Sequence, residues 1–389
     1  MPLPLSYNVR SVRSRWRLTL LAVLGIALVV AVFTVLLAMS EGFATALRST
    51  GRTDNAMIVL RGSNSELGSQ VRLDHRKMIL DNDLLFRRPD GQALASWEWV
   101  VILALPRKSD GRRTNVTLRA VPPQAFEVRG GIRVTAGRRF TPGLDEVIVG
   151  RRIMDRVGGL ELNGRLKYQH KRLVIVGVFE SDGTAFESEV WGDFDTLGAL
   201  FERGVGSNSL VVRMKDPAQI PALDRWIRAQ PGMPLRALSE RKYYEDQAGP
   251  VAKVLKGLAA IVALVMGIGA VFGAMNTMYA IVAARTREIG TLRALGFSRV
   301  AVLLSFMLES AFLAIIGGVL GCLLAFPMHG FSTGTSNIQT FAEIAFAFRI
   351  TPGIVAASLI FAGVMGVAGG LLPALRAARM PIAGALRQG

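Results

Sequence analysis

The sequence lacks the side-chain patterns that most enzymes and metal-binding proteins need. Its 389 residues include one cysteine, Cys322, and three histidines, His75, His170 and His329, which are far apart in the chain. A disulfide within one chain is therefore excluded, and a metal site would need a chance convergence of isolated ligands. The patterns H-E-x-x-H, C-x-x-C and G-x-x-x-x-G-K-[ST] are all absent. We therefore expect no metal, cofactor or nucleotide to be bound by this chain, and no catalysis.

One short pattern does match a catalytic motif. Gly330-Phe331-Ser332-Thr333-Gly334 fits the G-x-S-x-G nucleophile elbow of hydrolases. That elbow requires a strand before it and a helix after it, on a parallel sheet. Here the pattern lies between two long apolar runs, where no sheet is expected. We interpret it as a glycine-rich turn and not as a catalytic site.

Charged residues are also rare in four long apolar stretches. The mean hydropathy of +0.37 is high for a soluble protein, and about 20 apolar residues suffice to span a bilayer. The first stretch is longer than the apolar part of a cleaved signal peptide, despite the small residues at Ala38-Met39-Ser40, so we expect it to be retained. The four predicted spanning helices are Leu18–Met39, Val254–Ala284, Ala301–Phe326 and Ile354–Leu372.

Basic residues outnumber acidic ones by 46 to 29, and most of the excess lies beside the apolar stretches. From Glu41 to Pro250 the sequence has 32 basic and 26 acidic residues, whereas the remainder has 14 and 3. Because no nucleic-acid-binding motif accompanies this charge, we expect contact with membrane lipids and no nucleic-acid partner. Residues 1–17 are expected to form a basic amphipathic helix on the membrane surface, the alternative being a solvated tail.

The distribution of arginine predicts the orientation in the membrane. The N-terminal segment has four arginines, the segment 285–299 has four and the C-terminal tail has three. The segment 327–351, in contrast, has only one, Arg349. The positive-inside rule then places both termini and the segment around Arg287 in the cytosol. We expect a multi-pass protein of the bacterial inner membrane, with the long segment between the first two spans outside the cytosol.

That long segment, Glu41 to Pro250, has the pattern of an α+β domain of its own. Helices are predicted at Phe194–Arg203 and Ala218–Gln230. A hairpin is predicted at Leu160–Phe179, with one turn at Asn163-Gly164 and another at the polar stretch Gln169–Lys171. The predicted strands are Ala56–Leu60, Trp97–Leu105, Asn115–Val121, Glu146–Val149, Leu173–Phe179 and Leu210–Met214.

A charged segment, Ala283 to Ser298, separates the second and third apolar stretches. Its apolar residues Ile289, Leu292 and Leu295 recur at helical spacing, which predicts a short amphipathic helix. Arg285 and Glu288 are three residues apart and can pair. Gly296 supplies a C-terminal stop, and Ser298 can cap the helix that follows.

Phe272 to Gly321, which contains T-R-E-I-G-T-L-R-A-L-G, resembles the permeases of MacB/FtsX-type ABC transporters. Gly369 to Arg387 is similar to the C-terminal P-A-x-x-A-A-x-x-x-P-x-x-A-L ending of the same family. In that family the T-R-E-I-G segment is the cytosolic element against which the ATPase rests. The resemblance therefore implies the following ATPase-coupling residues: Arg285, Arg287, Glu288, Ile289, Thr291, Leu292, Leu295 and Gly296.

The resemblance and the apolar pattern together imply four transmembrane α-helices with a large α+β extracytoplasmic domain between the first and second. A β-rich insert at about 115–191 is expected within that domain. The expected segments are a cytosolic helix (1–17), first span (18–40), periplasmic domain (41–250), second span (251–284), coupling helix (285–299), third span (300–326), short periplasmic loop (327–351), fourth span (352–376) and cytosolic tail (377–389).

Glu309 is the one acidic residue well inside an apolar stretch, where an unpaired carboxylate is costly. It is expected to pair with Arg299, Asn276 or a backbone group near the cytosolic end of the third span. The alternative is a relay or a substrate contact. Because S-F-M-L-E-S matches a usual glutamate of the family, the resemblance favours a structural or coupling role for Glu309. Asn276 is expected to take part with it in coupling within the membrane.

The resemblance implies a permease subunit that works with a separate cytosolic ATPase, which binds ATP and Mg²⁺. Two copies, or one copy and a similar permease, would pair, and movements of the periplasmic domain would drive export or extraction of a substrate. A periplasmic adaptor and an outer-membrane duct are further implied partners. The alternative is a signalling subunit that controls a cell-wall hydrolase or sensor kinase without transport. A channel or secondary transporter is disfavoured by the few polar groups in the spans.

Overall fold

The computed structural model describes residues 16–168, 170–337 and 340–382, and it divides into two compact units. The helical unit contains the chain up to Glu41, Val254–Phe331 and the chain from Phe348 onward. The α+β domain contains Gly42–Lys253 and Ser332–Ala347. The helix predicted for residues 1–17 and the end of the predicted cytosolic tail lie almost wholly outside the described residues.

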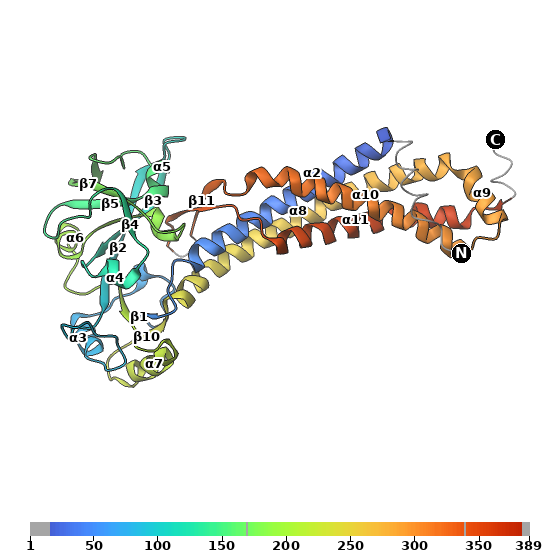
Figure 1. Cartoon of the computed structure of the whole chain (residues 1–389). Helices are drawn as coiled ribbons and strands as arrows, with labels where there is room; N and C mark the ends of the chain where they lie inside the picture. Colours follow the sequence, from blue (N-terminus) through green and yellow to red (C-terminus); the bar gives the residue numbers. More distant parts are fainter. Residues whose placement is uncertain (1–15, 169, 338–339, 383–389) are drawn as a thin grey trace. The chain divides into compact units, whose positions relative to one another are not determined.

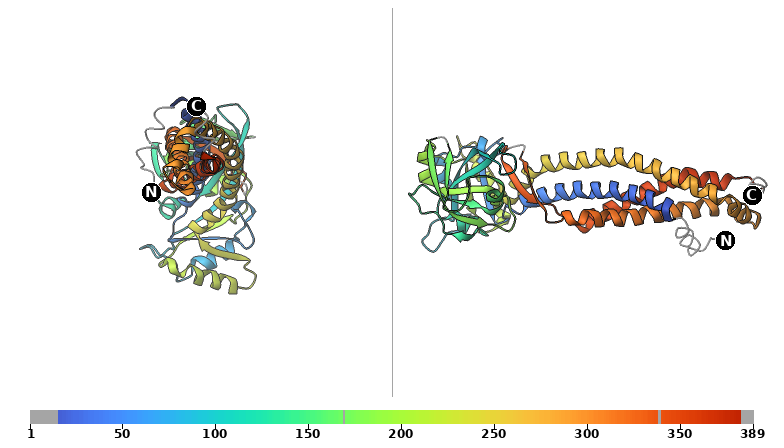
Figure 2. Two further views of the ribbon diagram at one scale, coloured as in Figure 1. Left: turned by 90° about the vertical axis from the view of Figure 1, so that its right-hand side faces the viewer. Right: turned by 90° about the horizontal axis from the view of Figure 1, so that it is seen from above.

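Four long helices of the described chain are long and apolar enough to cross a membrane. They lie at the four predicted stretches and run side by side in the helical unit (Figures 1 and 2). These helices are α2 (Trp16–Arg48), α8 (Glu240–Ala284), α10 (Arg299–Ala325) and α11 (Pro352–Arg379).

Two of these helices extend beyond the apolar stretches that predicted them. α2 continues to Arg48, and its last turns bury Phe43 and Leu47 in the α+β domain. α8 begins at Glu240, and its first turns bury Tyr243 and Tyr244 there. The sequence of these extensions is too polar to be lipid-embedded, so tertiary packing and not membrane burial stabilises them as helix.

The helices of the bundle approach closely at small residues. A Cβ on Gly321 of α10 would lie 2.6 Å from the carbonyl oxygen of Ala27 in α2, and one on Gly366 of α11 would lie 2.4 Å from Ala314 Cβ. Glycine is needed at both positions because a side chain would force the backbones apart. By contrast, Gly269 and Gly273 of α8 have open space beside them. Glycine spacing alone therefore does not reveal which pairs contact a neighbouring helix.

The α+β domain is built on a ten-stranded mixed sheet with the order β10-β1-β9-β2-β3-β8-β5-β7-β4, to which β6 adds beside β7. Each of the six predicted strand stretches forms a strand. The strands are β1 (Asn55–Leu60), β2 (Ala95–Pro106), β3 (Arg113–Val121), β4 (Arg133–Gly137), β5 (Glu146–Gly150), β6 (Arg165–Tyr168), β7 (Lys171–Glu180), β8 (Glu189–Asp193), β9 (Ser209–Arg213) and β10 (Leu235–Ser239).

Short helices connect the strands and cover the sheet. The predicted helix at Phe194–Arg203 ends at Leu200, because the chain turns at Glu202 with a positive φ of 53°. The helices of the domain are η1 (Glu66–Gly68), α3 (Leu73–Leu80), α4 (Ala125–Arg129), α5 (Arg151–Arg156), η2 (Ala185–Ser188), α6 (Phe194–Leu200), η3 (Pro217–Gln219) and α7 (Ile220–Ala229).

The domain has two hydrophobic cores. One is centred on β1, β9, β10 and α7, with Ile58, Leu210 and Leu223 fully buried. The other is centred on β3, β5, β7 and β8, with Val149 and Val190 fully buried. Strand β2 is twelve residues long and contributes to both cores. One continuous strand therefore joins the two halves of the domain.

The segment between α10 and α11 is more structured than the short loop predicted at 327–351. After η4 (Phe326–Met328) it forms the antiparallel hairpin of β11 (Ser332–Ser336) and β12 (Glu343–Ala347), which belongs to the α+β domain. The interpretation of Gly330–Gly334 as a glycine-rich turn is confirmed only at Gly330, which lies in a turn with a φ of 81°. It is wrong from Ser332 to Gly334, which lie in β11. Since β11 is antiparallel and is followed by a strand, it is not a nucleophile elbow either.

Candidate coupling site

Helix α9 (Thr286–Ala294) connects α8 to α10 at one end of the bundle (Figure 1). The chain leaves α9 through Gly296, whose φ of 94° is accessible to glycine at little cost. The N–H groups of Gly296 and Phe297 donate to the carbonyls of Arg293 and Leu292, each at 3.2 Å, which is a Schellman ending. Ser298 Oγ then accepts from the N–H of Ala301 at 3.1 Å and caps α10. The predicted stop and cap are confirmed.

The inner face of α9 is held against the bundle by one apolar anchor. Ile289 is 2% exposed and packs in a cluster that draws on α8, α9, α10 and α11. Gly290 beside it is buried as well. The other members of this cluster are Met278, Ile281, Val282, Val302, Phe306, Ala374 and Ala377.

A buried ion pair fixes the junction between α8 and α9. Arg285 Nη1 lies 2.9 Å from Glu309 Oε2 on α10, and both side chains are almost fully buried. Arg285 Nε also lies 2.9 Å from Glu288 Oε2, and its guanidinium carbon is 5.2 Å from the centre of the Phe306 ring. The predicted pairing of Arg285 with Glu288 is confirmed. Arg285, which reaches Glu309 from the end of α8, was not among the partners expected for this carboxylate.

The outer face of α9 is open. Arg287, Glu288, Thr291 and Leu295 are exposed, and Leu295 is 73% exposed although it is apolar. Gly296 is also exposed and Leu292 is partly buried, whereas Arg285 and Ile289 are buried. Of the eight predicted coupling residues, five are therefore exposed, Leu292 is partly buried, and two, Arg285 and Ile289, are buried and hold α9 in place. Asn276 is exposed on α8.

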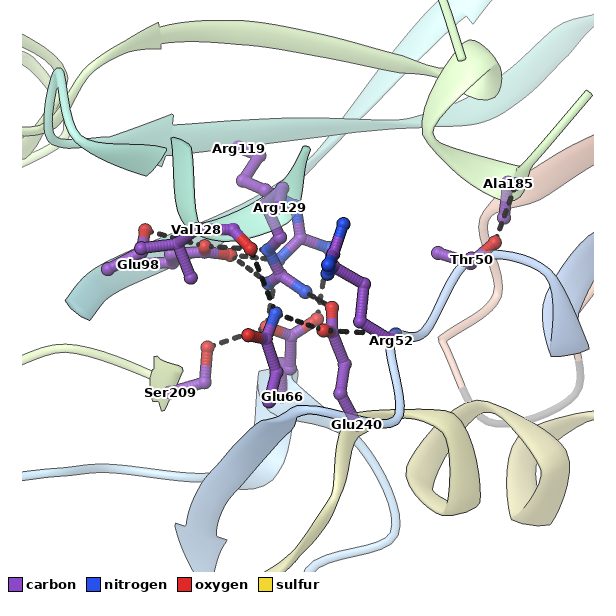
Figure 3. Close-up of polar contacts among 12 residues, drawn as sticks. Thr50, Arg52, Glu66, Glu98, Arg119, Val128, Arg129, Ala185, Ser209 and Glu240 are labelled. Atoms are coloured by element: carbon purple, nitrogen blue, oxygen red, sulfur yellow. Dashed lines mark hydrogen bonds and ion pairs between the residues drawn. The ribbon is translucent and has the colours of Figure 1, made fainter. Parts of the chain in front are cut away.

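The other end of α8 begins inside a buried ion network in the α+β domain (Figure 3). We use this name for Glu66, Glu98, Arg119, Arg129, Glu189 and Glu240. Glu240, the first residue of α8, forms a salt bridge with Arg129 Nη1, and Arg129 Nη2 lies 2.5 Å from Glu98 Oε2. The side chains of all three residues are fully buried.

Arg119 on β3 is the second centre of the buried ion network. Its guanidinium lies 2.7 Å from Glu98 Oε2, 2.8 Å from Glu66 Oε1 and 2.7 Å from Glu189 Oε2. Burial acts to raise the pKa of Glu98, but Arg129 and Arg119 outweigh it and lower this pKa to about 2. Glu98 therefore remains ionised and holds both arginines.

The chain that leaves α2 is attached to the same region. The N–H of Arg52 donates to Glu240 Oε2 at 3.3 Å, and Asn55 Nδ2 donates to that oxygen at 2.7 Å. Thr50 Oγ1 accepts from the N–H of Ala185 at 2.8 Å. The chain that follows α2 thus contacts Glu240 at the start of α8, and it contacts η2 separately through Thr50 (Figure 3).

The β11–β12 hairpin has its own ionic attachment. The fully buried carboxylate of Glu343 lies 2.7 Å from Arg156 Nε and 3.1 Å from Arg107 Nε, and it also accepts from Thr114. Burial acts to raise the pKa of Glu343, but Thr114, Arg156 and Arg107 lower it. The segment between α10 and α11 is therefore fixed to β3, to α5 and to the connection between β2 and β3.

Sequence reasoning missed the buried ion network and Glu343. The available signal was a charged residue within an apolar strand, as with Glu98 in S-W-E-W-V and Arg119 in T-L-R-A-V. Such a residue needs a buried partner, but the sequence does not say which one. Within the described ranges, no group of three or more histidine, cysteine, aspartate or glutamate side chains could hold a metal ion.

Comparisons with known proteins identify the family. Residues 19–230 match the model of the MacB-like periplasmic core domain, and residues 260–382 match that of the FtsX-like permease C-terminal domain. The chain is 26% identical over 325 residues to the macrolide export ATP-binding/permease protein MacB of Neisseria gonorrhoeae. The aligned region covers 77% of the chain and 48% of that protein. The chain thus spans about half the length of the curated MacB relatives.

Two further relatives complete the comparison. The uncharacterized ABC transporter permease YvrN of Bacillus subtilis (strain 168) is 26% identical over 421 residues, covering 98% of the chain and 96% of that protein. The solved periplasmic region of MacB from Actinobacillus actinomycetemcomitans covers 54% of the chain at 11% identity, with a TM-score of 0.38. The core-domain model alone covers more than half of the 389 residues. The chain therefore belongs to the MacB/FtsX family of ABC transporter permeases.

Proposed function

We propose that this permease couples ATP hydrolysis by a separate ATPase chain to movements of its α+β domain, and that these movements drive export or extraction of a substrate. The observation that carries the proposal is the continuity of α8. This one helix begins at Glu240 in the buried ion network and ends at Ala284, next to α9. A displacement of α9 is therefore delivered to the sheet through a single element.

The length and continuity of α8 suit this role. Its 45 residues give a rod of about 68 Å at roughly 1.5 Å per residue. At the domain end, the salt bridge with Arg129 prevents Glu240 from sliding past the sheet without separating buried charges. At the other end, the pair between Arg285 and Glu309 joins α8, α9 and α10. Both ends are fixed by contacts that are costly to break.

The outward face of α9 is the proposed contact for the ATPase. Arg287 and Glu288 offer opposite charges, and the exposed side chain of Leu295 offers an apolar anchor for a complementary pocket. Support for an ATPase on another chain comes from YvrN, a relative described as an ABC transporter permease that the chain matches over almost its full length. That ATPase would bind ATP and Mg²⁺.

The proposed orientation has both termini and α9 in the cytosol of a bacterial inner membrane, which the arginine distribution supports. Pairing with a second copy or a similar permease is part of the proposal, as expected of a MacB-like permease. A periplasmic adaptor and an outer-membrane duct are further proposed partners. Lipid, lipoprotein, peptide and hydrophobic drug are the substrate classes to be tested.

The test combines charge reversal with removal of the apolar anchor. Arg287→Glu with Leu295→Asp should reduce co-purification of the ATPase at least about tenfold. The double variant reverses the charge and removes the apolar side chain that are proposed to bind the ATPase, and loss of a few such side chains removes most of the affinity of an interface. Arg225→Glu, on the exposed surface of α7, is the matched control and should leave co-purification unchanged. Retention of the ATPase by the double variant would contradict the proposed contact.

A second measurement distinguishes transport from signalling. Proteoliposomes with the ATPase are supplied with candidate lipids and peptides, and substrate release is measured beside ATP hydrolysis. Transport predicts release that depends on ATP and on an intact α9. ATP-dependent activation of a wall hydrolase or sensor kinase with no release of any substrate would favour the signalling alternative.

A further inference from the structure

A groove of about 840 Å³ lies in the helical unit between α8 and α11, beside the start of α9. It is separate from the outward face of α9, with which it shares none of its lining residues. The lining residues are Asn276, Tyr279, Ala280, Val282, Ala283, Thr286, Arg376, Arg379, Met380 and Pro381.

The groove is strongly basic. Arg376 and Arg379 are exposed, the lining contains no acidic residue, and neither arginine forms an ion pair within the described part of the chain. Arg376 is held over the ring of Tyr279, with its guanidinium carbon 5.8 Å from the ring centre. Arg285 nearby, in contrast, has two carboxylate partners. Basic residues are favourable at a helix C-terminus, but this explains neither their position in a groove nor the lack of a carboxylate there.

The two walls of the groove change from apolar to polar along the helices. On α8, Phe272 and Asn276 are four residues apart and share one face, and on α11 the same holds for Leu372 and Arg376. Phe272 and Leu372 are 63% and 50% exposed. On each wall, a polar side chain thus lies near the end of the helix. An exposed apolar side chain lies one helical turn further from that end, towards the middle of the predicted span.

This arrangement matches the chemistry of a membrane lipid with a negative headgroup. Guanidinium groups bind phosphate oxygens with two parallel hydrogen bonds, and the amide of Asn276 adds a further donor. The apolar surface one turn deeper fits an acyl chain. We propose that the groove binds an anionic phospholipid, with its phosphate at Arg376 and Arg379.

Native mass spectrometry of the full chain tests the proposal. The protein is released from mixed micelles containing equal amounts of phosphatidylglycerol and phosphatidylcholine. Each arginine near an anionic lipid contributes roughly a fivefold preference, so the wild type should retain phosphatidylglycerol over phosphatidylcholine. Arg376→Gln with Arg379→Gln should remove this preference, whereas Arg299→Gln, an exposed arginine at the start of α10 outside the groove, should keep it.

Several outcomes would overturn the proposal. They are an equal retention of both lipids by the wild type, a preference unchanged in the double variant, and displacement of the lipid by millimolar inorganic phosphate. The Arg376→Lys, Arg379→Lys variant keeps the charge and should retain part of the preference, so it covers the case in which the glutamine variant does not fold.

A photo-crosslinking residue at the exposed Ala280 identifies the occupant without removing either arginine. In membranes, an adduct with phosphatidylglycerol supports the proposal. An adduct with the ATPase or with a second copy of the chain would overturn it and would assign the groove to a protein contact. This result is independent of the test of α9, because α9 is unchanged in the crosslinking variant.

Discussion

At the scale of single residues, the α+β domain buries its costliest charges around the residue at which α8 begins. Arg129 and Glu98 are fully buried, and each would be strongly destabilising without a partner. Glu98 contacts both Arg119 and Arg129, so it is the carboxylate that joins the two arginines of the buried ion network. The stability of the α+β domain should therefore depend on this one carboxylate.

Glu98→Gln tests this dependence. The substitution keeps the shape but removes a buried carboxylate from between two guanidiniums, which keep their other carboxylate partners. The free energy of unfolding should therefore fall by about 1–3 kcal/mol. Urea unfolding of the full chain can be followed by tryptophan fluorescence, because Trp97, Trp99, Trp191 and Trp226 lie in the domain. Asp74→Asn, in an exposed pair with Arg72, is the control and should have little effect. An unchanged unfolding midpoint in Glu98→Gln would show that the network is energetically neutral.

The same carboxylate predicts a pH dependence. The pKa of Glu98 is about 2 in the folded chain, against an ordinary value of 4.5. A lowered pKa contributes stability that is fully present above pH 4.5 and is lost as the pH falls towards 2. The wild type should therefore lose more stability than Glu98→Gln between pH 6 and pH 3, measured as the shift in urea midpoint. Equal shifts in the two proteins would contradict this assignment.

At the scale of elements, α8 contains one weak point. Pro250 lies inside the helix, close to the boundary at Lys253 where the α+β domain ends. Proline has no N–H to donate and its ring crowds the preceding turn, so the helix bends more easily there. This is the position at which a long rod is expected to flex when it transmits a displacement.

Pro250→Ala should make α8 stiffer. Spin labels at Lys242→Cys and Lys256→Cys, both exposed, lie about 21 Å apart at roughly 1.5 Å per residue. In a Cys322→Ser background, the distance distribution between them should be narrower with alanine than with proline at position 250. Val254→Ala, an exposed position on the same helix, serves as the control. Identical widths in all three proteins would remove the flexible point from the proposed mechanism.

At the scale of the whole molecule, the proposal requires α9 and the α+β domain to face opposite sides of the membrane. The chain has a single cysteine, so a Cys322→Ser background permits labelling at chosen positions. Thr291→Cys on α9 and Arg165→Cys on β6 are both exposed.

In intact cells with a permeable outer membrane, an impermeant maleimide should label Arg165→Cys directly. It should label Thr291→Cys only after the inner membrane is opened, because a charged reagent does not cross the bilayer. Labelling of both cysteines before the inner membrane is opened would contradict the four-span orientation.

Much of the architecture could be predicted from local patterns in the sequence. The four long helices follow from uninterrupted apolar stretches, and the ending of α9 follows from Gly296 and Ser298, since hydropathy and capping act over a few neighbouring residues. The extension of α8 back to Glu240 was not predictable in this way. Its first turns are polar, and Tyr243 and Tyr244 are stabilised by the domain around them.

The candidate coupling site, too, could be predicted from the sequence only in part: its exposed residues were predicted and its buried ion pair was not. The sequence indicated Arg287 and Leu295 through the family motif, and both are exposed. It did not indicate that Glu309 pairs with Arg285, because the two residues are 24 positions apart and the sequence also allowed Arg299 and Asn276 as partners.

The sequence by itself determined which segments are helical and apolar, how α9 begins and ends, and to which family the chain belongs, because each is encoded in short runs of residues. Only the tertiary structure decided that Glu240 meets Arg129 and that Glu343 meets Arg107. These pairs lie 111 and 236 residues apart in the chain. A charge specifies that a buried partner is needed, but only the packed sheet brings one particular partner within reach.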